Sequence, residues 1–395
     1  MRAWEKAKPS SKKTYIKETH MKTIGIGIIG WGFMGRMHAY GILNMPLYYN
    51  NSGFKAKLIG VCSGHIENAL HAKEELDLEF ATDDYRELLK RDDIDAVCIC
   101  TPNDTHEEIF TAAARAKKHI YIEKPLALDY AQAQRMAKTA RECGVIVNTV
   151  FNNRFYPATM RAKQLIDEGR VGDIISFRAA YLHSGSVDPN RPAGWKQLKS
   201  ASAGTLPDLG SHVLDLVHWL IGDVAKIFCK TQTLYKERTN KAGQTEDAAE
   251  DAAYMTLVME NGAMGMVEAT KIATGQNDSM RFEISGTKGA VRFDSADPNW
   301  LWFYDNTEKE GALGLDKGYK QIESIGRFEK PGGAFPSGKN GIGFTRCHAH
   351  SMFNFVNSIN EGKQTAPTID DGAYVNLLLD KARLSDESGV FVNVR

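Results

Sequence analysis

Short apolar runs alternate with helix-like segments over the first 150 residues of the chain. The apolar runs are rich in β-branched residues and cysteine, and they occupy 23–30, 58–62, 96–100, 119–122 and 145–150. Segments with helical spacing of apolar residues lie between them, at 33–44, 65–76, 84–90, 105–117 and 129–143. This alternation predicts βαβ units and a parallel sheet covered by helices on both faces. We therefore expect a doubly wound, α/β Rossmann domain over residues 21–150.

The pattern changes after residue 150. One helix-like segment at 155–168 precedes a series of runs with strand-like composition, at 173–182, 224–235, 248–259, 263–271, 280–285 and 289–293. Asn261-Gly262 lies between two of these runs and suits a tight hairpin turn, because such a turn needs φ > 0. A Gly- and Pro-rich stretch at 305–343, which we expect to be a loop, precedes helical patterns at 345–361 and 370–386. Residues 151–395 are therefore expected to form a second, α+β domain.

The charge and composition of the chain limit its partners. The 395 residues include 49 basic and 49 acidic side chains, so the formal net charge is zero. This balance argues against nucleic acid and against an anionic membrane, because both attract an excess of positive charge. We find no apolar run of about 18 residues, the length that a membrane-spanning helix needs. Six scattered cysteines suit a cytoplasmic setting, and residues 1–20 form a basic extension without the apolar segment of a secretory signal.

A glycine-rich turn follows the first predicted strand. It has the sequence Gly30-Trp31-Gly32-Phe33-Met34-Gly35 and opens a predicted helix, as a dinucleotide-binding G-x-G-x-x-G motif must. Gly30 allows the tight turn, Gly32 lets backbone N–H groups approach the pyrophosphate, and Gly35 lets the helix close on the sheet. After the second strand, Ser63 stands where an acidic residue usually binds the ribose, and no Arg or Lys follows closely to hold a 2′-phosphate. We predict NAD as the cofactor, with NADP as the open alternative.

Polar motifs follow the next two predicted strands. Thr101-Pro102-Asn103-Asp104-Thr105-His106 comes after the run at 96–100, and Glu123-Lys124-Pro125 comes after the run at 119–122. Ligands of open α/β sheets bind at the carboxyl ends of the strands, so these motifs should border the same crevice as the glycine turn. The candidate cofactor contacts among them are Thr101, Pro102, Asn103, His106, Glu123 and Lys124. For Glu123, a structural cap and a ligand to the cofactor ribose are equally open.

Together with Asn152-Asn153-Arg154-Phe155 and the run TLPDLGSHVLD at 205–215, these motifs resemble the Gfo/Idh/MocA oxidoreductase family over residues 21–395. The resemblance implies an open-faced, mostly antiparallel sheet in the second domain and a nicotinamide held between the domains, with Asn152 among its contacts. It also implies a sugar, polyol or glycoside as substrate, and it assigns the positions of Lys124, Asp208 and His212 to catalysis. The chain departs from the family pattern at Ser63 and at Ser202-Ala203-Gly204, where many members have three glycines.

The chemistry of alcohol oxidation leads to the same catalytic candidates. Removing a hydride from a carbinol carbon requires a base for the hydroxyl proton and a cation for the developing alkoxide. His212 provides the first type of group and Lys124 the second. On a regular helix Asp208, four residues before His212, can accept the imidazole N–H and fix its tautomer. We predict that Lys124 binds the reacting oxygen, that His212 takes the proton and that Asp208 orients His212.

Further side chains are candidates for substrate binding or for a metal site. Arg154, Trp195 and Asp215 join Lys124, Asp208 and His212 in the predicted substrate site. The indole of Trp195 suits the face of a sugar ring, but Arg154 and Trp195 could equally be packing residues, and Asp215 could only cap or orient. Cys347-His348-Ala349-His350 contains metal-ligand residue types. Because positions i and i+2 of a helix do not share a face, we predict no metal.

Two other functions fit the same motifs. A related enzyme could oxidise C3 of a glycoside transiently with bound NAD and then cleave the glycosidic bond. A non-catalytic protein could use the fold to sense dinucleotide and sugar, although the joint presence of Lys124, Asp208 and His212 argues for catalysis. On the resemblance alone we favour a glucose-like or anhydro-sugar ring oxidised at C3. Since an open sheet leaves one face to be covered, we also expect a homo-oligomer, either a dimer or a tetramer.

Overall fold

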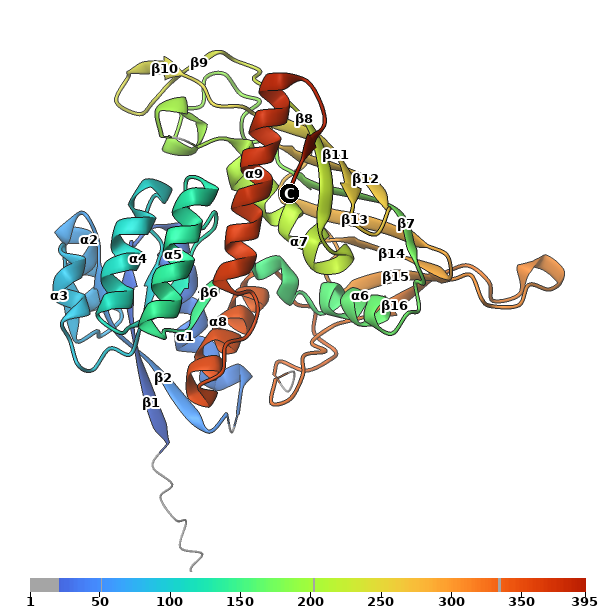
Figure 1. The fold of residues 1–395 in the computed structure, drawn as a ribbon. Helices are drawn as coiled ribbons and strands as arrows, with labels where there is room; N and C mark the ends of the chain where they lie inside the picture. The colour runs from blue at the N-terminus through green and yellow to red at the C-terminus, as the bar shows by residue number, and fades with distance from the viewer. Residues whose placement is uncertain (1–20, 51, 202, 333–334) are drawn as a thin grey trace, which may run out of the picture.

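The computed structural model describes residues 21–50, 52–201, 203–332 and 335–395. The predicted basic extension at residues 1–20 and Ser202 of the variant glycine run lie outside these ranges. Two sheets organise the chain, one near each end of the sequence, and helices from the C-terminal region lie between them (Figure 1). No helix within the described ranges combines the length and the apolar content that crossing a bilayer would require.

The N-terminal sheet has six parallel strands in the order β3-β2-β1-β4-β5-β6. Its strands are β1 (Lys22–Ile29), β2 (Phe54–Cys62), β3 (Phe80–Thr82), β4 (Ala96–Ile99), β5 (His119–Ile122) and β6 (Val147–Thr149). The intervening helices are α1 (Phe33–Tyr48), α2 (Ile66–Glu75), α3 (Tyr85–Leu89), α4 (His106–Arg115) and α5 (Tyr130–Cys143). The predicted Rossmann sheet is confirmed. Its strand order reverses between β1 and β4, which is where sheets of this kind bind ligands.

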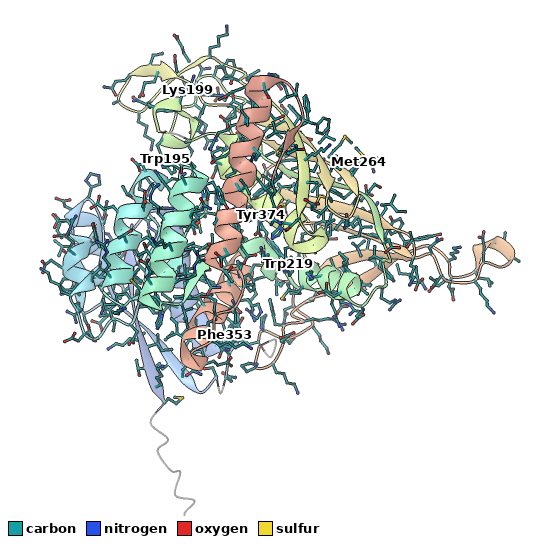
Figure 2. The ribbon with its side chains drawn as sticks, in the orientation of Figure 1. Trp195, Lys199, Trp219, Met264, Phe353 and Tyr374 are labelled. Carbon is teal, nitrogen blue, oxygen red and sulfur yellow. The ribbon has the colours of Figure 1, made fainter. Side chains whose placement is uncertain are left out.

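Helix α8 (Phe344–Glu361) belongs to the core of this first sheet although it comes from the far end of the sequence. Met352, Phe353 and Phe355 are buried in one apolar cluster with Ile24 and Ile26 of β1. Phe353 is labelled on α8 beside the N-terminal sheet in Figure 2. Helix α9 (Ile369–Ser388) contacts α5 on one side and β8 of the second sheet on the other. The C-terminal helices therefore join the two sheets.

The second sheet is mixed but mostly antiparallel, in the order β16-β15-β14-β13-β7-β12-β11-β8-β17, and among the described strands only β7 and β12 pair in parallel. Its strands are β7 (Ile174–Leu182), β8 (Val224–Gln232), β11 (Ala252–Met259), β12 (Met264–Thr270), β13 (Ser279–Gly286), β14 (Gly289–Asp294), β15 (Trp300–Asp305), β16 (Tyr319–Glu323) and β17 (Val392–Asn393). A separate hairpin joins β9 (Glu237–Thr239) to β10 (Thr245–Asp247). The mostly antiparallel sheet is confirmed, but the stretch at 305–343 is not all loop, because it contains β16.

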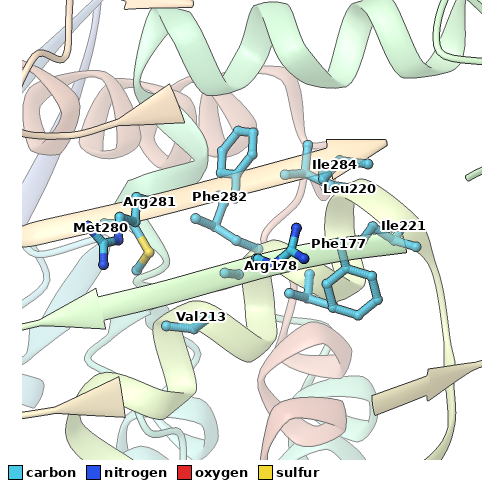
Figure 3. A pocket seen from close by; sticks show the side chains of 12 residues that line it. Phe177, Arg178, Val213, Leu220, Ile221, Met280, Arg281, Phe282 and Ile284 are labelled. Carbon is cyan, nitrogen blue, oxygen red and sulfur yellow. The ribbon is translucent and has the colours of Figure 1, made fainter. Parts of the chain in front are cut away.

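The inner face of the second sheet packs on α6 (Pro157–Asp167) and α7 (Ser211–Ile221). Figure 3 shows apolar side chains of β7 and β13, among them Phe177 and Phe282, beside Val213 and Leu220 of α7. All four side chains are buried. This packing holds α7 in place, and the first turn of α7 carries His212.

Candidate active site

A cavity of about 1050 Å³ lies at the carboxyl ends of β1, β4 and β5. Its N-terminal wall consists of the glycine turn, the Thr101 motif and the Glu123-Lys124-Pro125 motif. Its other wall includes Trp195 of the short helix η3 (Trp195–Gln197), Asp208, His212 and His348. The structure thus brings the three strand-end motifs to one crevice, opposite the run that contains Asp208 and His212.

The glycine turn has free space and free N–H groups where a dinucleotide phosphate would lie. Gly30 has a φ of 102°, and a Cβ atom there would lie 2.7 Å from the backbone of Cys100. A Cβ atom on Gly35 would lie 2.1 Å from the carbonyl oxygen of Gly30, so α1 can start this close to β1 only with glycine. Among the described residues, a Cβ built on Gly32 meets nothing within 4 Å, and no side chain caps α1. Uncapped N–H groups at a helix start favour an anion.

Most of the predicted cofactor contacts border this cavity. Those that do are Gly30, Trp31, Gly32, Phe33, Met34, Ser63, Thr101, Pro102, Asn103, Glu123, Lys124 and Asn152. Gly35 lies behind the turn and acts through packing. His106 is also away from the cavity: it is fully buried, and its ring nitrogens lie 3.2 Å from the Leu126 carbonyl oxygen and 3.1 Å from that of Thr101. His106 therefore supports the Thr101 turn, contrary to its predicted contact with the cofactor.

Glu123 is a buried carboxylate that lines the cavity. Its Oε1 atom lies 2.9 Å from Nε2 of His38, whose Nδ1 lies 3.1 Å from Sγ of Cys100. Burial opposes ionisation of Glu123, but the hydrogen bond with His38 and the charge of Lys124 bring its pKa below the usual value. An ionised Glu123 held by His38 is compatible with both roles that the sequence left open.

Asp208 lies at the centre of a cluster of lysines. Nζ of Lys124 donates to Oδ1 of Asp208 at 2.9 Å and to its carbonyl oxygen at 2.8 Å. Nζ of Lys196 donates to Oδ1 at 2.7 Å, and Nζ of Lys271 lies 3.0 Å from Oδ2. These lysines come from the end of β5, from η3 and from the end of β12. One carboxylate faces three ammonium groups, which leaves positive charge beside the cavity.

This cluster controls the protonation of the site. Burial alone would raise the pKa of Asp208, but Lys124, Lys271 and Lys196 hold it well below its usual value. Burial lowers the pKa of Lys124, and the charge of Asp208 opposes that change. Burial and then the positive charge of Lys124 hold the pKa of His212 well below its usual value. At neutral pH Asp208 is therefore ionised and His212 is a neutral imidazole.

The predicted hydrogen bond from His212 to Asp208 does not form. Leu206–Gly210 is a π-helical turn that leads into α7, so the four-residue spacing no longer stacks the two side chains. The Asp208 carboxylate is occupied by lysines, and Nδ1 of His212 is buried with no hydrogen-bond partner among the residues that the structure describes. The His212 ring packs edge-on against Tyr181, with 5.6 Å between ring centroids. Packing therefore orients this imidazole, and Asp208 does not.

Arg154 and Asp215, both predicted to bind substrate, bind each other. Nε and Nη2 of Arg154 donate to the two carboxylate oxygens of Asp215 at 2.9 and 2.6 Å, and Nη2 also donates to Asp371 at 2.9 Å. Arg154 and Asp215 are buried, and neither lines the cavity. Their placement contradicts the predicted substrate contacts and joins η2 (Asn152–Phe155), α7 and α9. Trp195 does border the cavity and is 40% exposed (Figure 2).

Several polar side chains of the site were not predicted. Tyr181, His183, Lys196 and Asp278 line the cavity, and Lys271 lines a smaller one beside it. Nε2 of His183 lies 3.1 Å from Oδ1 of Asp278. His183 and Lys271 directly follow β7 and β12, the one parallel pair of the second sheet, so the strand-end rule could have found both. Lys196 lies in a segment without a periodic pattern, and no signal in the sequence identifies it.

Comparison with known proteins identifies the family. The model of the oxidoreductase family with an NAD-binding Rossmann fold, GFO_IDH_MocA, matches residues 24–151, and the model of the GFO/IDH/MocA C-terminal domain matches residues 159–292. Levoglucosan dehydrogenase of Pseudarthrobacter phenanthrenivorans is 31% identical over 379 residues, which cover 91% of this chain and 95% of that protein. The chain belongs to the Gfo/Idh/MocA family. Myo-inositol 2-dehydrogenase of Thermotoga maritima is 30% identical over 363 residues, covering 92% and 96% of the two chains.

Solved structures extend the comparison of this Gfo/Idh/MocA oxidoreductase to its cofactor. Levoglucosan dehydrogenase in complex with NADH matches with a TM-score of 0.90 and 31% identity, over 95% of this chain and all of that one. The same enzyme with NADH and levoglucosan matches with a TM-score of 0.89. The predicted cofactor, NAD, is confirmed, and the open cradle at Gly32 with the uncapped start of α1 fits it. The part of the chain described by the structure contains no group of three or more His, Cys, Asp or Glu side chains suited to a metal ion.

Proposed function

We propose that this oxidoreductase removes hydride from a ring carbon that bears a secondary hydroxyl in a sugar or polyol. A glucose-like or anhydro-sugar ring, oxidised at C3, is the substrate that we favour. The observation that carries the proposal is the 2.9 Å contact between Lys124 and Asp208, which joins the NAD-binding sheet to the turn before α7 beside His212. The relatives named levoglucosan dehydrogenase and myo-inositol 2-dehydrogenase support a cyclic substrate with several hydroxyl groups.

In the proposed reaction, residues of the chain accept the proton and stabilise the developing negative charge. NAD, when bound, accepts the hydride. Lys124 donates a hydrogen bond to the reacting oxygen and stabilises negative charge on it. The imidazole of His212 accepts the hydroxyl proton, and its low pKa keeps the ring unprotonated before the reaction. In the direction of reduction, the same two groups act in reverse.

The proposed role of Asp208 differs from the one that its sequence position suggests. Its carboxylate binds Lys124 and Lys196 and lies 3.0 Å from Nζ of Lys271. It therefore positions Lys124 at the cavity wall and favours the charged form of that lysine. The remaining positive charge of the cluster stabilises an alkoxide, because such charge acts strongly in a site shielded from water.

A screen of alcohols with both cofactors tests this function. Inositols, free aldoses, 1,5- and 1,6-anhydro sugars and aryl glucosides are each supplied with NAD or NADP, and reduced cofactor and product are quantified. We expect turnover of one ring class with NAD, with NADH formed in proportion to oxidised product. Release of an aglycone without net NADH would instead identify glycoside cleavage. Binding of NAD and sugar without any turnover would identify a sensor.

We also propose that the protein forms a homo-oligomer, a dimer or a tetramer, through the outer face of the second sheet. Tyr254, Met264 and Met266 on this face are 42%, 50% and 57% exposed, and the face contains a groove of about 670 Å³ (Figure 2 labels Met264). An exposed apolar patch on a sheet favours association. Light scattering of wild type and Met266→Asp tests the proposed association, and a monomeric wild type would contradict it.

All six cysteines are free thiols, which supports the proposed cytoplasmic setting.

A further inference from the structure

The Cys347-His348-Ala349-His350 motif places two buried histidines in α8 with opposite surroundings. Nδ1 of His350 lies 2.5 Å from the hydroxyl oxygen of Tyr49, and the His350 ring packs 4.4 Å from that of Phe328. His350 does not line the active-site cavity. His348 does line it, is 3% exposed, and neither of its ring nitrogens has a hydrogen-bond partner within the described part of the chain. The two histidines therefore differ in their surroundings, although they are two residues apart.

Burying ring nitrogens without hydrogen-bond partners costs free energy, and a bound ligand can lower this cost by pairing with one of them. A buried polar group without a partner costs about 1–3 kcal/mol, and native proteins rarely leave such groups unpaired. Burial lowers the pKa of His348 to about 3, so the ring is neutral at physiological pH. A neutral imidazole has one donor and one acceptor. A hydroxyl group both donates and accepts, so a ligand hydroxyl can pair with either ring nitrogen, whichever tautomer the ring adopts.

His348 is connected to the glycine turn through Phe344. Its ring packs edge-on against Phe344 at 4.5 Å, and Phe344 stacks at 6.5 Å on Phe33 of the glycine turn. Glu123, Asp278 and His212 line the same cavity as His348. Because His212 and His348 line one cavity, a ligand that fills it can place one hydroxyl beside His212 and another beside His348.

We propose that His348 binds a hydroxyl group of the sugar or polyol and so helps to determine which ring the enzyme accepts. This inference rests on the proposed dehydrogenase function. The ribose of the cofactor offers the same chemistry, and the experiment separates the two sources. In either case α8, a helix of the Rossmann core, contributes a ligand-binding side chain to the cavity.

The test compares His348→Phe with His350→Phe. For each protein we would measure kcat/KM with the best substrate of the screen and with its monodeoxy analogues, the Kd for NADH without sugar, and the free energy of unfolding. His348→Phe should lower kcat/KM for the parent substrate about 10- to 100-fold, which corresponds to one lost hydrogen bond and its unpaired partner. The loss should vanish for one deoxy analogue only. The Kd for NADH should stay within about twofold of wild type, and the free energy of unfolding should not fall. His350→Phe should instead lower stability and leave the pattern among analogues unchanged.

His348→Gln is the second variant, because it keeps a donor and an acceptor and should restore part of the activity if the Phe variant folds poorly. An equal loss for the parent and every deoxy analogue would overturn the inference. A large rise in the Kd for NADH would overturn it in favour of the cofactor ribose. An active wild type with an unaffected His348→Phe would overturn this inference alone. A wild type inactive on every sugar and polyol would overturn the proposed function as well.

Discussion

The two walls of the active-site cavity are assembled in different ways. The wall formed by the six-stranded sheet consists of segments that directly follow parallel strands, so its geometry is set by the backbone and by glycines at fixed positions. The opposite wall consists of side chains from η3, a π-helical turn, the start of α7, the end of β7, and α8. These side chains are far apart in the sequence, and ion pairs and packing hold them together. We call the first the cofactor wall and the second, which the proposed substrate would face, the substrate wall. The cofactor wall can be predicted from local sequence, whereas the substrate wall can be recognised only from the fold.

The largest effect should come from the substrate wall. Replacing His212 with Asn removes the proposed proton acceptor and should lower kcat about 10²–10⁴-fold, the usual contribution of general base catalysis. The Kd for NADH should change little, since the cofactor wall is intact. Steady-state kinetics and an NADH titration measure the two quantities, and full turnover by the variant would contradict the assignment.

The positions of the cofactor-wall motifs could be predicted from the sequence because each motif follows one strand, but His106 supports the Thr101 turn instead of lining the cavity. Gly30 and Gly35 show their role in the turn itself, where an added Cβ would meet backbone. The predicted contact between Asp208 and His212 is wrong because it assumed a regular helix, whereas the residues around Asp208 form a π-helical turn. The prediction also failed for Arg154 and Asp215, whose charges satisfy each other in the core. The partners of Asp208 could not be predicted because Lys196 and Lys271 reach it only through tertiary structure.

Arg154→Met should separate stability from catalysis. The change leaves Asp215 and Asp371 without their shared cation, and removing one partner of a buried ion pair costs about 3–5 kcal/mol. The free energy of unfolding, measured with denaturant, should fall by that order while KM for substrate stays within a few-fold of wild type. Unchanged stability with a large rise in KM would restore Arg154 to the substrate site.

Two glycine variants sharpen the account of the cofactor wall. Gly35→Ala places a methyl group against the carbonyl oxygen of Gly30, so it should lower stability by about 1–3 kcal/mol and weaken NADH binding. Gly32→Ala meets no atom in the free protein and should leave stability within about 0.5 kcal/mol of wild type, yet weaken NADH binding. Thermal unfolding and NADH titration distinguish them. Equal destabilisation by both substitutions would contradict this account of the turn.

The smallest expected effect is a shift in the pH profile. His212 must be neutral to accept a proton, so activity falls as the pH drops below its pKa. Because that pKa lies well below the usual value, kcat/KM should still be high near pH 6.5, where an unperturbed histidine is about half protonated. Lys196→Met removes a positive charge that lowers this pKa, so the acid limb should move to higher pH. A limb that stays in place or moves to lower pH would contradict the electrostatic role of the lysine cluster.

Transfer of isotope from substrate to cofactor is a direct test of the proposed hydride removal. The preferred sugar or polyol would be labelled with deuterium at the carbon predicted to be oxidised, incubated with NAD in ordinary water, and the reduced cofactor analysed by mass spectrometry. We expect one deuterium in each NADH formed by wild type and a rate at least about 10²-fold lower for Lys124→Met, which lacks the group that stabilises the alkoxide. NADH without deuterium, or labelled NADH formed at an undiminished rate by Lys124→Met, would contradict the proposal.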